Sequence, residues 1–90
     1  MKASKRVTRR SKEPKRIEVD VDAESEPLSI GMDGERNNIL AVYERWRLED
    51  EWWGKEERRC YYKIQTERGL VCDIYHEMLT DIWYLARTYD

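Results

Sequence analysis

Apolar and polar residues alternate along two neighbouring segments, residues 58–66 and 70–77, which are joined by three residues ending in glycine. Alternation with period two is typical of a half-buried β-strand. A three-residue hairpin loop usually ends in a left-handed residue, and Gly69 adopts that conformation without a Cβ clash. The loop length fixes the register. The expected cross-strand pairs are Thr66–Leu70, Ile64–Cys72, Tyr62–Ile74 and Cys60–His76 on an apolar face, and Gln65–Val71, Lys63–Asp73, Tyr61–Tyr75 and Arg59–Glu77 on a polar face.

Three other segments, residues 17–21, 28–32 and 82–89, show the same alternation and are expected to be strands. Between the second of them and residue 35, the dipeptide Asp33-Gly34 predicts a tight hairpin turn. In the last segment, period two places Trp83, Leu85 and Tyr89 on one face.

Residues 37–53 fit both a helix and a strand. Apolar residues at helical spacing, good helix formers and Gly54 after the segment favour a helix. The period-two alternation that continues from the Asp33-Gly34 turn favours a strand with Leu40, Val42, Trp46 and Leu48 on one face. We adopt the strand because the neighbouring segments are strands.

These patterns predict a mainly β fold: one small domain over residues 17–90, with five or six antiparallel strands forming a small barrel or curled sheet. Residues 1–16 differ, because they contain eight basic residues, one acid and few apolar side chains. We expect them to form a disordered basic arm. Residues 17–90 contain 9 basic and 18 acidic residues, so the basic arm precedes an acidic body.

Trp52 and Trp53 lie in an acidic stretch, residues 49–57, that is expected to be a loop or a single turn. Adjacent residues in an extended chain point to opposite faces, so one indole can cover the core while the other is exposed. The alternative is that both indoles seal one end of the barrel. The candidate partner-binding residues are Trp46, Trp52, Trp53 and Trp83.

The sequence contains no nucleophile–base arrangement, P-loop, GxGxxG, HExxH or CxxC motif. We therefore expect no catalytic activity, no cofactor and no metal site. Cys60 and Cys72 lie about 13 Å apart along the predicted sheet, which is too far for a disulfide. No apolar leader or membrane-length apolar run is present, so a cytoplasmic protein is expected.

The segment RWRLEDEWW, residues 45–53, and the segment RRCYYKIQTERGLVCDIYHEMLTDIWYLARTYD, residues 58–90, resemble a small bacterial domain of unknown function. That domain resembles the C-terminal extension of some Y-family DNA-polymerase-like repair proteins. The resemblance covers residues 42–90, is weaker over residues 17–39 and is absent over residues 1–16. Asp81 stands where the family commonly has a turn glycine. The resemblance implies a non-catalytic accessory module connected to DNA repair, and it assigns no functional residue.

Two functions follow as hypotheses. The first is an interaction module that binds a protein of DNA repair or replication. The second is a nucleic-acid-binding protein that neutralises phosphates with the basic arm and stacks bases on an exposed tryptophan. The arm residues expected to contact nucleic acid are Lys5, Arg6, Arg9, Arg10, Lys12, Lys15 and Arg16.

Overall fold

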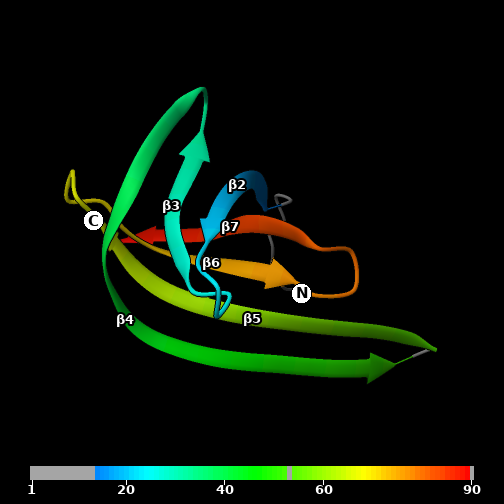
Figure 1. The fold of residues 1–90 in the computed structure, drawn as a ribbon. Helices are drawn as coiled ribbons and strands as arrows, with labels where there is room; N and C mark the ends of the chain where they lie inside the picture. Colours follow the sequence, from blue (N-terminus) through cyan, green and yellow to red (C-terminus); the bar gives the residue numbers. More distant parts are fainter. Residues whose placement is uncertain (1–13, 53, 90) are drawn as a thin grey trace, which may run out of the picture.

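Six antiparallel strands close into a barrel in which each strand pairs with its neighbours in the sequence and the first pairs with the last (Figure 1). The structure is a computed structural model that describes residues 14–52 and 54–89. The predicted mainly β antiparallel fold is confirmed, and of its two expected forms the structure shows the barrel rather than the curled sheet. The strands are β2 (Lys15–Val21), β3 (Pro27–Met32), β4 (Glu35–Trp52), β5 (Lys55–Thr66), β6 (Val71–Glu77) and β7 (Ile82–Tyr89).

A small apolar core lies inside the barrel. Residues from β2, β3, β5 and β6 form its fully enclosed part: Ile17, Ile30, Ile64, Cys72 and Ile74. A ring of partly buried side chains from β2, β3, β4, β5 and β7 and from Leu70 packs around them. Below, the side of each strand that points to this core is called the inner face, and the opposite side is called the outer face.

The β5–β6 hairpin has the register that the sequence predicts. Ile64 lies opposite Cys72 and Lys63 lies opposite Asp73. In the loop, the Thr66 amide donates a hydrogen bond of 2.8 Å to the Leu70 carbonyl. Gly69 has a φ of 95°, so it takes the left-handed conformation that the three-residue loop requires.

Replacing Gly69 with valine is expected to lower the free energy of unfolding by more than about 1 kcal/mol, because a β-branched residue is strained at positive φ. No atom outside the loop lies within 4 Å of a Cβ built at this position, so backbone strain is the only cause. Urea unfolding of both proteins measures the difference. Unchanged stability would show that the loop relaxes to ordinary backbone angles at no cost.

Residues 37–53 were the ambiguous segment, and the prediction of a strand is confirmed for residues 37–52 by β4. The expected shared face is confirmed for Leu40, Trp46 and Leu48, which are exposed, and is wrong for Val42, which packs against the core. The β4–β5 register shifts between Ile39 and Ala41 and again between Val42 and Glu44, so Leu40 and Tyr43 are extra residues in two β-bulges. Ile39 and Val42 pack against the core, whereas Leu40 is 63% exposed.

The acidic stretch 49–57 is the end of a long hairpin rather than a loop. Pairing between β4 and β5 continues to Trp52 opposite Lys55, while β6 pairs with β5 only from Arg59 onward. This hairpin end therefore extends beyond the rest of the barrel, at the lower right of Figure 1. The prediction of a loop or a single turn for residues 49–57 is wrong. Acidic residues and a glycine are typical of loops, but a strand that is exposed to water on both faces also accepts charged residues on both faces.

Two smaller predictions also need correction. Lys15 and Arg16 belong to β2 and pair with Leu85 and Tyr84 of β7, so they are not part of a disordered arm. Tyr89 does not share the face of Trp83 and Leu85. A register shift in the β6–β7 pairing, between Asp73 and Ile74, makes Ala86 an extra residue and moves Tyr89 to the outer face.

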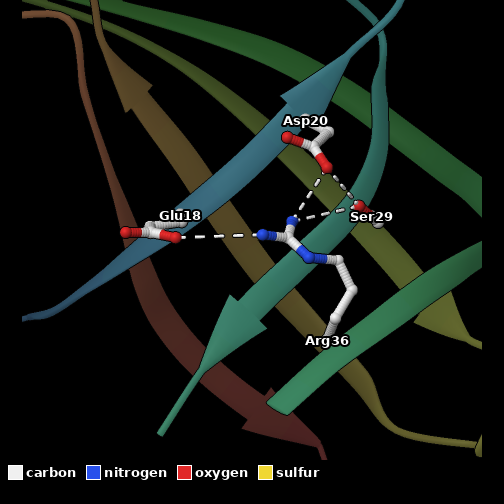
Figure 2. A network of polar contacts seen from close by, with 4 residues as sticks. All are labelled: Glu18, Asp20, Ser29 and Arg36. Atoms are coloured by element: carbon white, nitrogen blue, oxygen red, sulfur yellow. Dashed lines mark hydrogen bonds and ion pairs between the residues drawn. The ribbon is translucent and has the colours of Figure 1, made fainter. Parts of the chain in front are cut away.

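Arg36 connects the first three strands on the outer face (Figure 2). Its guanidinium donates hydrogen bonds to Asp20 at 2.9 Å and to Ser29 at 3.3 Å, and it lies 3.8 Å from a carboxylate oxygen of Glu18. Gly31 lies between Glu18 and Arg36 in the register, and without a side chain it leaves room for the guanidinium to cross β3.

Candidate interaction surface

The outer side of β4 carries a line of exposed apolar side chains. Its members, which we call the β4 stripe, are Leu40, Tyr43, Trp46 and Leu48. They are half of the eight large apolar residues that are exposed in the described part of the chain. The two bulges bring the first two of them to this side, since each bulge adds one residue between inner-face positions. The Tyr43 hydroxyl also donates a hydrogen bond to Gln65, an outer-face residue of β5.

A row of closely spaced aromatic rings, which we call the stacked row, continues from the stripe across the outer face of the sheet. It runs across β4, β5, β6 and β7 through Trp46, Tyr61, Tyr75 and Tyr84. The ring centroids of successive members lie 5.2, 4.9 and 5.1 Å apart. The three tyrosines cover one another's faces, and Tyr75 is only 4% exposed. Trp46 is the end of the row and is 41% exposed, so it is the ring that offers surface to a partner.

Arg59 holds the middle of the aromatic row in place. Its guanidinium lies 4.7 Å from the centre of the Tyr75 ring and donates a hydrogen bond of 3.2 Å to the Tyr61 hydroxyl. It also lies within ion-pair distance of Glu57 and Glu77. Burial, opposed by the nearby guanidinium, raises the pKa of Tyr75. The phenol therefore stays neutral at physiological pH, and the row behaves as an apolar support.

The structure does not bring the four candidate tryptophans together. Trp46 lies on the outer face, whereas Trp83 lies on the inner face, packed against the core and stacked on His76 at 4.6 Å. The backbone of Trp52 lies at the end of the β4–β5 hairpin, opposite Lys55. Trp53 lies outside the described residues, so the hypothesis of one buried and one exposed indole at 52 and 53 stays a prediction.

The two basic arm residues that the structure describes are engaged in the barrel. Lys15 forms an ion pair of 2.6 Å with Asp33 in the β3–β4 turn, and Arg16 lies opposite Tyr84. The other residues of the predicted nucleic-acid-contacting arm lie outside the described residues: Lys5, Arg6, Arg9, Arg10 and Lys12. Arg16 and Arg36 line an open depression of about 470 Å³, but Glu18 and Asp20 already neutralise Arg36 there.

The inner face of β4 beyond the core is polar. Arg45 donates hydrogen bonds to Glu26 from Nε, at 2.8 Å, and from Nη2. The hydrogen bond from Arg45 lowers the pKa of the Glu26 carboxyl. This pair connects the β2–β3 loop to β4, so the loop is fixed next to the point where β4 leaves the barrel.

Asp73 is the one buried carboxylate of the outer face in the described chain, and it is 5% exposed. One of its oxygens accepts a hydrogen bond of 2.7 Å from the Tyr89 hydroxyl, while Oδ1 has no hydrogen-bond partner among the described residues. The hydrogen bond to Asp73 raises the pKa of Tyr89. The cations of Lys63 and Arg87 lie 4.6 and 4.8 Å from the Tyr89 ring centre. The group is a closed polar contact between β5, β6 and β7.

The two cysteines and the single histidine lie on the inner face of β5 and β6, where Cys60 is opposite His76 and Cys72 is opposite Ile64. Cys60 and Cys72 are free thiols, and burial raises the pKa of Cys72 to about 11. His76 lies 2.6 Å from Asp81, which has a φ of 61°. Across residues 14–52 and 54–89, no cluster of three or more His, Cys, Asp or Glu side chains is arranged to hold a metal ion. The same residues contain no helix of the length and apolar character needed to cross a membrane.

Sequence reasoning placed Leu40, Trp46 and Leu48 on one face but named only Trp46 as a candidate binding residue, and it missed Tyr43 and the stacked row as a unit. The Tyr61–Tyr75 pair followed from the hairpin register, and the register alone could have extended the row to Tyr84 once β7 was placed beside β6. The stripe depends on the two bulges, which the alternation of apolar residues does not reveal.

A scan against protein-family models and searches of curated proteins and of solved structures found nothing that matches this chain. The resemblance to a domain associated with DNA-repair proteins therefore stays a hypothesis.

Proposed function

We propose that this chain is a non-catalytic interaction module that binds a protein partner on the β4 stripe. The observation that carries the proposal is the concentration of exposed apolar side chains on one strand, two of them Tyr43 and Trp46. Exposed apolar patches on soluble proteins commonly mark interaction sites, and tyrosine and tryptophan contribute strongly to binding at such sites.

The stacked row makes the stripe suitable for binding. Trp46 rests on Tyr61 with the two rings only 9° from parallel, so its orientation is set before a partner arrives. Less side-chain freedom is then lost on binding. The resemblance adds the class of partner to try first, a polymerase-like protein of DNA repair.

Charge favours a protein over a nucleic acid as the partner of this surface. Residues 14–89 contain 11 basic and 17 acidic residues, a net charge of −6. A surface of this sign repels phosphate. The basic residues before position 14 leave nucleic-acid binding as the second hypothesis, and strong weakening of binding by salt would distinguish it.

The test is affinity capture with the full chain and two matched leucine variants. Leu40→Ser removes a member of the stripe that is 63% exposed, and Leu79→Ser removes an equally large side chain, 53% exposed, in the β6–β7 turn. We expect the Leu40 variant to lose the captured partner at unchanged melting temperature, while the Leu79 variant retains it. Equal capture by the two variants would contradict the proposal.

A further inference from the structure

One edge of β4 lacks a neighbouring strand over most of its length. β3 pairs with β4 only between Glu35 and Asn38. From Ile39 to Trp52, among the described strands, β4 pairs with β5 alone. Such an edge presents backbone N–H and C=O groups that can pair with another strand. Beyond the second bulge the β4–β5 register continues to Trp52 without a shift, so this part of the edge is regular.

The side chains along this regular edge are exposed on both faces. Every residue from Tyr43 to Glu51 is exposed, although the residues of β5 that pair with Trp46 and Arg47 are partly buried. Leu48 lies at the middle of the regular segment and is 43% exposed. A strand with these properties has both the backbone groups and the side-chain surface for a further strand.

The charge pattern along this edge of β4 is complementary to the same pattern on a second, antiparallel copy of β4. Four successive inner-face positions carry two cations followed by two anions: Arg45, Arg47, Glu49 and Glu51. If a second copy of β4 lies antiparallel and centred on Leu48, Arg47 faces Glu49 of the second copy and Arg45 faces Glu51 of the second copy. Two-fold symmetry doubles these contacts to four. Opposite charges directly across a sheet are stabilising, and like charges are destabilising.

Other registers lose this match. Residues that face each other across a sheet must point to the same side of it. In a two-fold antiparallel pair this condition holds only if the residue at the centre of the pairing lies opposite its own copy. Centring on Trp46 places Arg45 against Arg47, and centring on Arg47 or on Glu49 places that residue against its own copy. Leu48 is the one centre that pairs all four charges.

The contacts that these four charged side chains make within one copy still allow them to form ion pairs with a second copy. Glu26 accepts from Nε and Nη2 of Arg45, so Nη1 remains for Glu51 of the second copy. Glu51 lies opposite Glu56 on β5, a like-charge pair that a cation from a second copy would relieve. Arg47 and Glu49 are only loosely associated within one strand, at 3.8 Å.

We propose that two copies of this chain pair edge to edge through β4, antiparallel and centred on Leu48, in a two-fold symmetric dimer. The dimer uses the edge of β4, whereas the proposed partner binding uses its outer face. An experiment can therefore contradict one proposal without contradicting the other. Pairing about Leu48 also brings the two β4 stripes next to each other on one continuous sheet.

The experiment measures the mass of the full chain by sedimentation equilibrium at low salt, over a range of concentrations. The wild-type chain is expected to reach twice its mass of 11.0 kDa. Arg47→Glu alone and Glu49→Arg alone each place like charges across the two-fold axis, so each variant is expected to sediment as a monomer. Added salt should shift the wild-type dimer toward monomer, because exposed charges are screened.

An equimolar mixture of the two single variants provides the decisive result. A chain with glutamate at both positions and a chain with arginine at both positions restore every opposite-charge contact, so the mixture is expected to form a heterodimer. Recovery of the dimer also shows that each variant is folded. Arg68→Glu, which changes an exposed charge in the β5–β6 loop, is the control and should remain dimeric. A monomeric wild-type chain, dimeric single variants or a monomeric mixture would each overturn the proposal.

Discussion

Replacing Tyr75 with alanine is expected to lower the free energy of unfolding by about 3–5 kcal/mol, the range for removing a large buried aromatic side chain. Tyr75 is 4% exposed and lies between Tyr61 and Tyr84, so its loss removes two ring–ring contacts and the surface on which Arg59 rests. A domain of this size has a total stability on the order of 5–10 kcal/mol. Urea denaturation followed by tyrosine and tryptophan fluorescence measures the change.

Tyr75→Phe is the matched control, because it keeps the ring and removes only the hydroxyl. It should stay close to the wild type, and capture of the partner should be retained, since Trp46 keeps its support. If the alanine variant lost less than about 0.5 kcal/mol, the usual range for surface substitutions, the stacked row would not be a structural element of the barrel.

Ile64→Ala is expected to destabilise the barrel by about 2–5 kcal/mol, because it removes buried methyl groups and leaves a cavity. Ile64 is fully enclosed and lies between Val42 on one side and Cys72 on the other. Among the described residues, five enclosed apolar side chains form the centre of the core, so the surrounding residues have little freedom to close the gap. The free energy of unfolding, obtained by urea titration, gives the result.

The series Ile64→Val and Ile64→Ala separates a packing effect from a backbone effect. Valine should cost about 0.5–1.5 kcal/mol, since it removes one methylene group and keeps the β-branched shape. Equal losses for valine and alanine would contradict the cavity explanation.

The strands that sequence predicted correctly are those fixed by local chemistry. The three-residue loop ending in Gly69 determined the whole β5–β6 register, and Asp33-Gly34 determined the β3–β4 turn, where both residues have positive φ. Their sequences specify one turn geometry, and the turn then specifies every cross-strand pair.

The errors arise where one extra residue enters a strand. At Leu40, Tyr43 and Ala86 a bulge changes which residues share a face, so Leu40 was placed with Val42 and Tyr89 with Trp83. Period two in the sequence contains no signal for such an insertion, since the bulge depends on the curvature that the closed barrel imposes. Tyr43 was not grouped with Leu40, Trp46 and Leu48 for the same reason.

The β4 edge was missed for a different reason. Arg45, Arg47, Glu49 and Glu51 look like ordinary surface charges until it is known that their strand has a neighbour on one side only. The charge pattern is present in the sequence, but its meaning depends on the topology.

The pairing of β2 with β7 has a consequence for the order in which the chain folds during synthesis. Lys15 pairs with Leu85, a separation of 70 residues, whereas the other strand pairs join neighbours in the sequence. Contacts this distant form late, because the entropy of closing a long loop must be offset first. During synthesis β2 leaves the ribosome long before β7. In a nascent chain that ends before Ile82, β2 has no β7 to pair with, and Ile17 lacks its cross-strand neighbour Trp83. Synthesis of β7 is therefore expected to be the step after which the barrel can close.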